Sequence, residues 1–349
     1  MKLIRAAEIL IDKIKRDYKE EVAVVVMMGS HLYGETHRLS DLDMYFVVNT
    51  PRGYELGRTF IIDGIGFDFW PISWDRMERI ANHDERITAI ITEGQILYYG
   101  SEADLARFNA LKDKALDASD IRKFLGKAEN VLNNAYKPYF ELEKCDDLTA
   151  SRKKAINIVF SVTNAIALLN RDTVKRGRGK LKGELLAMPL VPYNFEKYYD
   201  VLFQSAQVSE IKVAMKALLE ETSNLIKRTR SDYDATRPED VKEKLTGFYE
   251  ELINFYNKIT HGIEIKDYVT VFYAANEIVL ELEDAFSGTG VSLEALPDII
   301  SSFDPNRMEA YGNIVATHQR ALEALLSNLG IEISVFKDFE ELSLVVGGL

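Results

Sequence analysis

The sequence predicts an α+β protein in which a small mixed-sheet domain precedes a helical bundle region. Alternating and β-branched apolar runs are confined to the first third of the chain, whereas helical periodicity dominates from about Ser119 onward. The 349 residues, 47% of them hydrophobic, are enough to build more than one buried core. We therefore place one domain at residues 1–117 and a helical region at 118–349, with a possible split near 231–238.

The first domain should hold an amphipathic N-terminal helix, several strands and two further helices. Residues Glu21–Met28 form a β-branched run that ends at Gly29, a pattern typical of a buried strand. Asp41–Val48 begins with strict alternation, so Asp41 and Asp43 should share one face of a second strand. The remaining expected elements are a hairpin over Arg58–Ile72 that turns at Asp63-Gly64, helices over Trp74–Asn82 and Ala103–Leu116, and a short strand over Gln95–Tyr99.

The second region is expected to be helical throughout. Its most apolar segment, 150–170, is hydrophobic nearly all round, which is typical of a helix at the centre of a bundle. Apolar residues at helical spacing predict this helix and others over 121–135, 194–205, 209–228, 238–259, 267–286 and 307–328.

The composition excludes several classes of protein. A formal net charge of -12 argues against a protein that holds long nucleic acid, because that function needs a basic face. Cys145 is the only cysteine, so neither an intramolecular disulfide nor a cysteine-based metal site is possible. The N-terminal segment has no continuous apolar stretch, and the chain has no apolar run long enough for a membrane span. We expect a cytoplasmic protein without membrane contact.

Gly29-Ser30, Asp41, Asp43 and Asp68 are the residues that point to chemistry. Glycine and serine at the exit of a strand let the backbone approach a phosphate and offer hydrogen-bond donors to it. Two aspartates side by side, joined by Asp68 from a neighbouring strand, can hold hard cations through oxygen ligands. Asp63 is the alternative third carboxylate, although an aspartate before glycine in a turn has a purely conformational explanation.

This combination resembles the DNA polymerase beta-like nucleotidyltransferase superfamily, whose signature is a Gly-Ser pair, a spacer, an Asp-x-Asp strand and a later strand aspartate. The resemblance covers about the first third of the chain. It implies that Asp41, Asp43 and Asp68 bind two Mg²⁺ ions and catalyse transfer, with Gly29 and Ser30 at the phosphates of ATP. It also implies that Ser40 assists the triphosphate.

Further candidates come from loops. Arg38 is a possible triphosphate contact, and His31 and His37 are either phosphate contacts or simply solvated. The basic run Lys175–Lys182, which includes Lys180, is either a solvated loop or a phosphate grip that reaches over the nucleotide. This run and the apolar helix before it look like the helical substrate domain of small-molecule nucleotidyltransferases, including antibiotic-modifying ones. This resemblance favours the interpretation that the run holds the phosphates of the nucleotide.

The expected reaction is magnesium-dependent transfer of AMP from ATP to a hydroxyl group, with release of pyrophosphate. The base is either Asp68 or a carboxylate of the helical region such as Glu129. The favoured acceptor is a small molecule, cationic if it resembles an aminoglycoside, or else a lincosamide-like compound. A protein hydroxyl, as in toxin-antitoxin systems, and a transfer-RNA end are the alternatives. A silent nucleotide-binding module stays open as well, and the sequence does not specify an oligomeric state.

Overall fold

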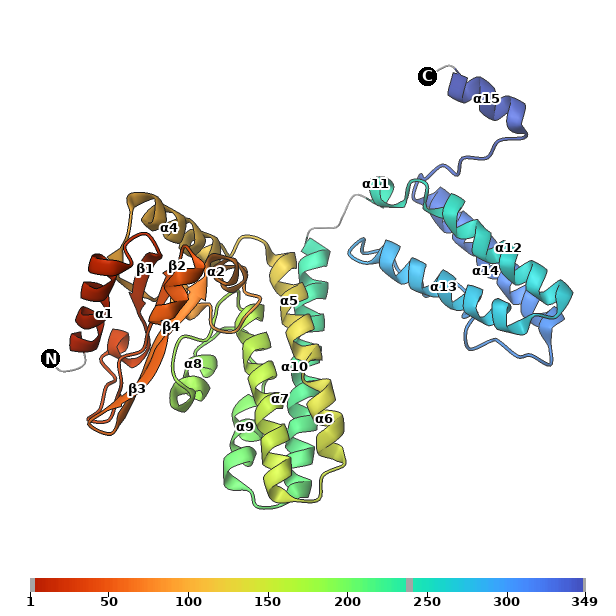
Figure 1. The fold of residues 1–349 in the computed structure, drawn as a ribbon. Coiled ribbons are helices and arrows are strands. Elements are labelled where there is room, and N and C mark those ends of the chain that lie inside the picture. The colour runs from red at the N-terminus through yellow and green to blue at the C-terminus, as the bar shows by residue number, and fades with distance from the viewer. Residues whose placement is uncertain (1–3, 237–240, 348–349) are drawn as a thin grey trace. The chain divides into compact units, whose positions relative to one another are not determined.

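The computed structural model describes residues 4–236 and 241–347, and the chain forms two compact units, Met1–Arg228 and Thr229–Leu349 (Figure 1). A five-stranded mixed sheet with helices comes first and the rest of the chain is largely helical, which confirms the predicted fold class. The domain boundary at 117/118 stays a prediction. The possible split near 231–238 includes residues 237 and 238, which lie outside the described residues.

The sheet has the strand order β3-β4-β2-β1-β5. Only the central pair β2 and β4 is parallel, and the hairpin β3-β4 turns at Asp63 and Gly64 as predicted, both with positive φ. Its strands are β1 (Val22–Met27), β2 (Met44–Val48), β3 (Arg58–Ile62), β4 (Ile65–Ser73) and β5 (Gln95–Tyr99).

The prediction that the second strand begins at Asp41 is wrong. β2 starts at Met44, so Asp41 and Asp43 lie in the segment that leads into the strand. A turn explains the difference, because the Ser40 N–H donates to the His37 carbonyl at 2.9 Å and the His37 N–H donates to the Ser40 hydroxyl at 2.9 Å. These bonds bend the chain just before Asp41.

Helices cover both faces of the sheet. Helix α1 (Ile4–Asp17) packs on one face, where it meets Leu42, Met44 and Phe46. The other face, with Tyr45 and Val47, is covered by α2 (Trp74–Ala81), α3 (Ala89–Thr92) and α4 (Glu102–Leu116). The predicted alternation of side chains along this segment is therefore correct.

The helical part of the first unit is built around α7 (Leu148–Leu169), which packs against α5 (Ile121–Asn133), α6 (Tyr136–Glu143) and α9 (Phe195–Gln204). Many of its residues on several sides are buried, which confirms the predicted central helix. Helix α6 was not predicted. The short α8 (Leu181–Leu186) follows a loop that begins after α7, and α10 (Val208–Thr236) is the longest helix described.

The second unit has a hydrophobic core of its own, formed by α12 (Phe248–Ile265), α13 (Tyr268–Phe286) and α14 (Met308–Asn328). The predicted helix over 238–259 is interrupted, because Gly247 adopts a φ of 82° between α11 (Val241–Leu245) and α12. Residues 238–240 of that prediction lie outside the described residues. No residue of α15 (Phe339–Gly347) is buried.

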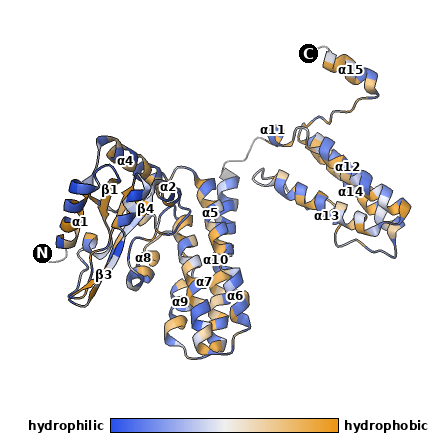
Figure 2. Cartoon of the chain, viewed as in Figure 1, coloured by the Kyte–Doolittle hydropathy of each residue, from blue (hydrophilic) through white to orange (hydrophobic). Residues whose placement is uncertain are grey.

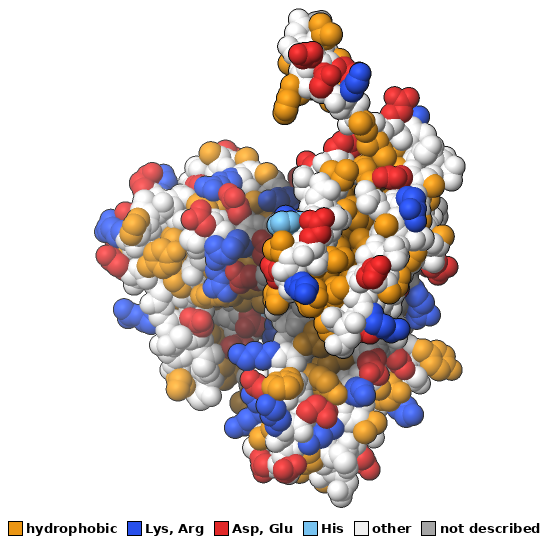
Figure 3. All heavy atoms as spheres, turned by 90° about the vertical axis from the view of Figure 1, so that its right-hand side faces the viewer, with side chains coloured by type: hydrophobic (Ala, Val, Ile, Leu, Met, Phe, Trp, Pro, Cys, Tyr) orange, Lys and Arg blue, Asp and Glu red, His pale blue; other side chains and the backbone are white. Residues whose placement is uncertain are grey.

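Hydrophobic residues lie on the packed sides of most helices, and hydrophilic residues lie on their other sides (Figure 2). Some hydrophobic side chains still reach the surface among charged ones on the face shown in Figure 3. Within the described ranges, no helix is both long and apolar enough to cross a membrane.

Candidate active site

Gly29 lies directly against the carboxylate of Asp43. It follows β1, opens the short 3-10 helix η1 (Gly29–Tyr33) and has a φ of 78°. A Cβ atom on Gly29 would lie 2.0 Å from Asp43 Oδ2, far inside any allowed contact. The backbone adds a link, because the Met28 N–H donates to the Asp43 carbonyl at 2.9 Å. Glycine is therefore needed here for both its conformation and its size.

The electrostatics around Asp43 favour a bound cation. Burial raises the pKa of the Asp43 carboxyl, and the nearby Asp41 charge raises it further, while His31 acts in the opposite direction. Among the described residues, the buried Nε2 of His31 has no hydrogen-bond partner. A hard cation on the carboxylates would offset both the burial and the repulsion, so the chemistry of this pair fits magnesium.

Asp68 reaches the same region from the neighbouring strand. Because β2 and β4 run in parallel with Met44 opposite Phe69, Asp68 is level with Asp43 at the start of the pairing. Asp68 is exposed to solvent. Nowhere in the described ranges, however, do three or more His, Cys, Asp or Glu side chains already form a group that could hold a metal ion. The three-aspartate ligand set therefore stays a prediction.

A cavity of about 290 Å³ opens between the sheet and the helices of the first unit. Gly29 and Asp43 line it from the sheet side, and Phe160 and Asn164 of α7 line it from the helical side. The loop residues 175–178 complete the wall. Gly29 of the predicted Gly-Ser pair, one predicted aspartate and part of the predicted basic run thus share one cavity.

Residues 175–178, which we call the basic loop, are held in place by contacts with two other elements. The Glu184 carboxylate of α8 accepts hydrogen bonds from the backbone N–H groups of Lys175 and Arg176, at 2.6 and 3.0 Å. The Arg176 guanidinium lies 4.4 Å from the centre of the Tyr33 ring and pairs with Glu35. Since Tyr33 ends η1, the loop is docked on the same short helix that begins at Gly29.

Comparison with known families identifies the helical part of this site. Residues 105–232, from α4 into α10, match the family described as the KNTase C-terminal domain. This segment is similar to that family over a little more than a third of the chain. It contains α7 and the basic loop, so the wall that faces Gly29 and Asp43 is formed by the segment that matches the KNTase C-terminal domain. The resemblance to nucleotidyltransferases that the sequence indicated is confirmed.

Other comparisons add little. The chain is similar to a solved structure described as a nucleotidyltransferase-like protein from Exiguobacterium sibiricum, with 13% identity, a TM-score of 0.32, and coverage of 64% of this chain and 75% of that one. No curated protein matches the chain.

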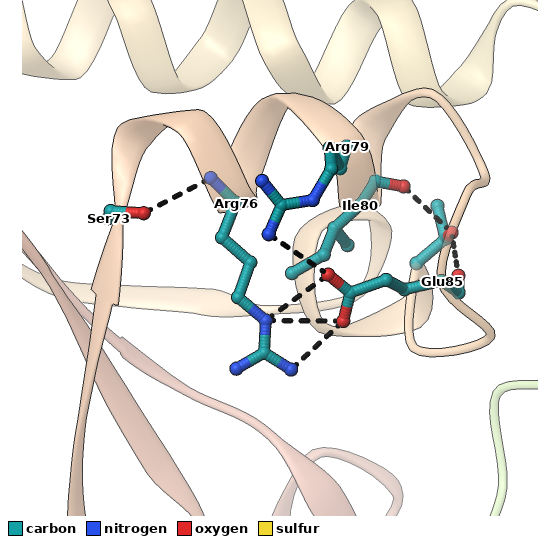
Figure 4. Close-up of polar contacts among 6 residues, drawn as sticks. Ser73, Arg76, Arg79, Ile80 and Glu85 are labelled. Carbon is teal, nitrogen blue, oxygen red and sulfur yellow. Dashed lines mark hydrogen bonds and ion pairs between the residues drawn. The ribbon is translucent and has the colours of Figure 1, made fainter.

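A second loop, which connects α2 to α3, contacts the segment that matches the KNTase C-terminal domain. The Glu85 carboxylate of this loop accepts hydrogen bonds from Arg76 Nε at 3.2 Å and from Arg76 Nη2 at 2.9 Å. Arg79 forms an ion pair with the same carboxylate at 3.8 Å (Figure 4). The Thr88 hydroxyl is bonded to the carbonyl of Ile80 at 2.9 Å. Arg86, which lies between Glu85 and Thr88 in the loop, lines the cavity, and its guanidinium lies 4.2 Å from the centre of the Phe160 ring.

Ser30, Ser40, Arg38 and Lys180 do not line the cavity. Ser30 is in the first turn of η1, and its carbonyl accepts the Glu35 N–H at 3.1 Å. Ser40 is buried within its turn, and Arg38 is exposed beside it. Lys180 borders a separate hollow next to the basic loop. Their roles at the nucleotide stay predictions.

The sequence-based prediction of the site did not include Arg86, Phe160 or Asn164, which line the cavity. Arg86 belongs to no motif, and Phe160 is one apolar residue among many in α7. Asn164 carried a weak signal, because an amide in the middle of an apolar helix needs a polar partner or a ligand. Arg178 lies in the basic run, for which the sequence predicts Lys180 as the phosphate contact.

Proposed function

We propose that this protein transfers the AMP moiety of ATP to a hydroxyl group of a small molecule and releases pyrophosphate. The observation that carries the proposal is the shared cavity, which joins Gly29 and Asp43 to the basic loop of a KNTase C-terminal domain. Carboxylates on one wall and cationic groups on the other are what a metal-bound triphosphate requires. Because the reaction consumes ATP, we also propose a cytoplasmic location.

In this proposal Asp41, Asp43 and Asp68 hold the two magnesium ions, which neutralise phosphate charge and make the acceptor hydroxyl easier to deprotonate when bound. Gly29 keeps the backbone close enough for phosphate oxygens, and Ser30 offers its hydroxyl to them. Asp68 is also proposed to accept the acceptor's proton, and its exposure to solvent supports this role. Ser40, Arg38 and Lys180 are assigned supporting contacts to the triphosphate.

A small acceptor, such as an aminoglycoside-like compound, is favoured over a protein. The family of the helical segment supports this choice. The size of the cavity, about 290 Å³, also suits a small ligand and leaves little room for a folded partner. The net charge of -12 supports a cationic acceptor and opposes a long nucleic acid.

The test measures transfer directly. The full chain is incubated with MgCl₂, ATP labelled at the α-phosphate, and a panel of aminoglycosides and lincosamides or a cell lysate separated into small-molecule, protein and RNA fractions. We expect label in the small-molecule fraction together with pyrophosphate release, and neither with Asp43→Asn. Label in protein or RNA would contradict the assigned acceptor.

A second candidate function is nucleotide binding without transfer. It is favoured by the absence of a preformed group of three metal ligands in the part of the chain that the structure describes. In that case ATP binds in the presence of magnesium, as measured by calorimetry, but no pyrophosphate is released with any acceptor fraction.

A further inference from the structure

Two arginines at the cavity share one aromatic ring. The Arg86 guanidinium lies 4.2 Å from the centre of Phe160, and the Arg178 guanidinium lies 5.1 Å from it. The first comes from the sheet side of the first unit and the second from the KNTase C-terminal domain. Stacking on a ring fixes the plane of a guanidinium and leaves its N–H edges open to an acceptor.

Neither arginine has a carboxylate partner among the described residues, whereas Arg52, Arg107 and several others do. Arg176 in the same loop is paired with Glu35, and Arg76 beside the other loop is paired with Glu85. Both Arg86 and Arg178 are exposed, so a ligand can reach them. Partial desolvation of the Arg86 guanidinium lowers its pKa, and the nearby charge of Arg178 lowers it further.

This repulsion indicates the kind of ligand that belongs between the two side chains. Two guanidinium groups without carboxylate partners that lie on one ring are stabilised by an anion that contacts both. A single carboxylate carries one charge and is satisfied by one arginine. A diphosphate carries several charges and has oxygens on adjacent phosphorus atoms. It can therefore accept hydrogen bonds from both guanidinium groups at once.

We propose that Arg86 and Arg178 form a clamp for the pyrophosphate portion of the nucleoside triphosphate. The clamp deepens the proposed function and rests on it for the source of the diphosphate. It also gives the ion pairs of Glu85 a role, since they hold the loop from which Arg86 projects (Figure 4).

The test is calorimetric titration of the full chain with sodium pyrophosphate in EDTA, so that no metal contributes. We expect Arg86→Gln and Arg178→Gln each to weaken binding at least about tenfold, because each removes a charged hydrogen-bonding partner. Phe160→Leu should also weaken binding, because it keeps the apolar volume but removes the stacking surface. Arg107→Gln is the matched control, since Arg107 stacks at 4.3 Å on Trp74 and is paired with Glu78 outside the cavity.

Pyrophosphate affinity unchanged by Arg86→Gln or Arg178→Gln overturns the clamp, as does an equal loss in Arg107→Gln. Binding of malonate as tight as that of pyrophosphate also overturns it, because a simple dicarboxylate would then suffice. The two proposals fail separately. Transfer of AMP with pyrophosphate binding insensitive to both arginines removes the clamp alone, whereas clamp-dependent pyrophosphate binding without any transfer removes the proposed function alone.

Discussion

The carboxylate of Asp43 occupies the space that a side chain on Gly29 would fill. One residue therefore controls both the turn that faces the cavity and the position of a predicted metal ligand. Gly29→Ala should lower kcat/KM for nucleotidyl transfer at least about 100-fold, because a misplacement of about 1 Å in a catalytic group has effects of that size.

A matched control separates crowding from backbone strain. Gly34 has a φ of 66°, close to that of Gly29, but an added Cβ there meets no atom within 4 Å. Both alanine variants should lose about 1–2 kcal/mol of stability from the left-handed backbone, and Gly29→Ala should lose more because its Cβ meets Asp43. Only Gly29→Ala should lose activity, and an equal loss in Gly34→Ala would contradict the role of the contact with Asp43.

Asp43→Asn should remove transfer and at the same time stabilise the fold. The pKa of Asp43 is raised by burial and by Asp41, so the folded state binds a proton more tightly than the unfolded state does. Stability therefore falls as pH rises from the unfolded value of 3.8 through the folded pKa, and the loss persists at pH 7. Removing the charge should raise Tm at pH 7 but not at pH 3, as measured by calorimetry.

Magnesium provides the complementary measurement on the same protein. MgCl₂ should raise the Tm of the wild type at pH 7, because a ligand that binds only the folded state stabilises it. Asp43→Asn should show no such rise. An equal rise in both proteins would place the magnesium elsewhere.

Glu184→Gln should weaken nucleotide binding by loosening the basic loop. A neutral amide accepts more weakly than the carboxylate that now receives the N–H groups of Lys175 and Arg176. We expect KM for ATP to rise several-fold, with little change in Tm. Glu221→Gln is the control, because Glu221 accepts in the same way from the backbone and side chain of Asn194, away from the cavity. A rise in KM for both variants would indicate a general loss of structure.

His318 should make the second unit sensitive to acid. Burial lowers its pKa from 6.5 to about 4, and its Nδ1 lies 2.7 Å from the hydroxyl of Tyr256. The unfolded state takes up the proton first, so stability is complete above pH 6.5 and falls as the pH drops toward 4. The loss is about 3 kcal/mol from this histidine.

Hydrogen exchange of peptides from α12 and α14 measures this effect within the second unit. Protection should fall with pH between 6.5 and 4 in the wild type, and the fall should be smaller in His318→Gln. His261→Gln is the control, since the His261 side chain is 69% exposed on α12. The same flattening in His261→Gln would assign the acid sensitivity to a different cause.

Local patterns predicted the fold well where short-range chemistry decides it. The hairpin at Asp63-Gly64 and the central helix α7 follow from turn preference and hydrophobic periodicity, and both are present. Helix α6 was missed because it is short and contains Pro138. The start of β2 was misplaced because hydrogen bonds between Ser40 and His37 override the alternation that continues through Asp41.

The candidate site was predictable only in part, for a related reason. Gly29 and Asp43 are close in sequence, and their spacing carries a recognisable pattern. The contacts of Arg86 and Arg178 with Phe160 join segments that are far apart in the chain. Only the tertiary fold of the first unit brings them together, and no local motif encodes that fold.

Two faces of helix α7 have different roles, because one is buried in the bundle and the other lines the cavity. Ile158, Val162 and Ile166 are fully buried, whereas Phe160 and Asn164, one turn apart, line the cavity. Substitutions at the two cavity positions can change the shape and polarity of the wall while the buried positions keep the bundle intact. The wall of the cavity can therefore be altered at position 164 without rebuilding the bundle, whereas Phe160 is constrained by the two arginines that lie on its ring.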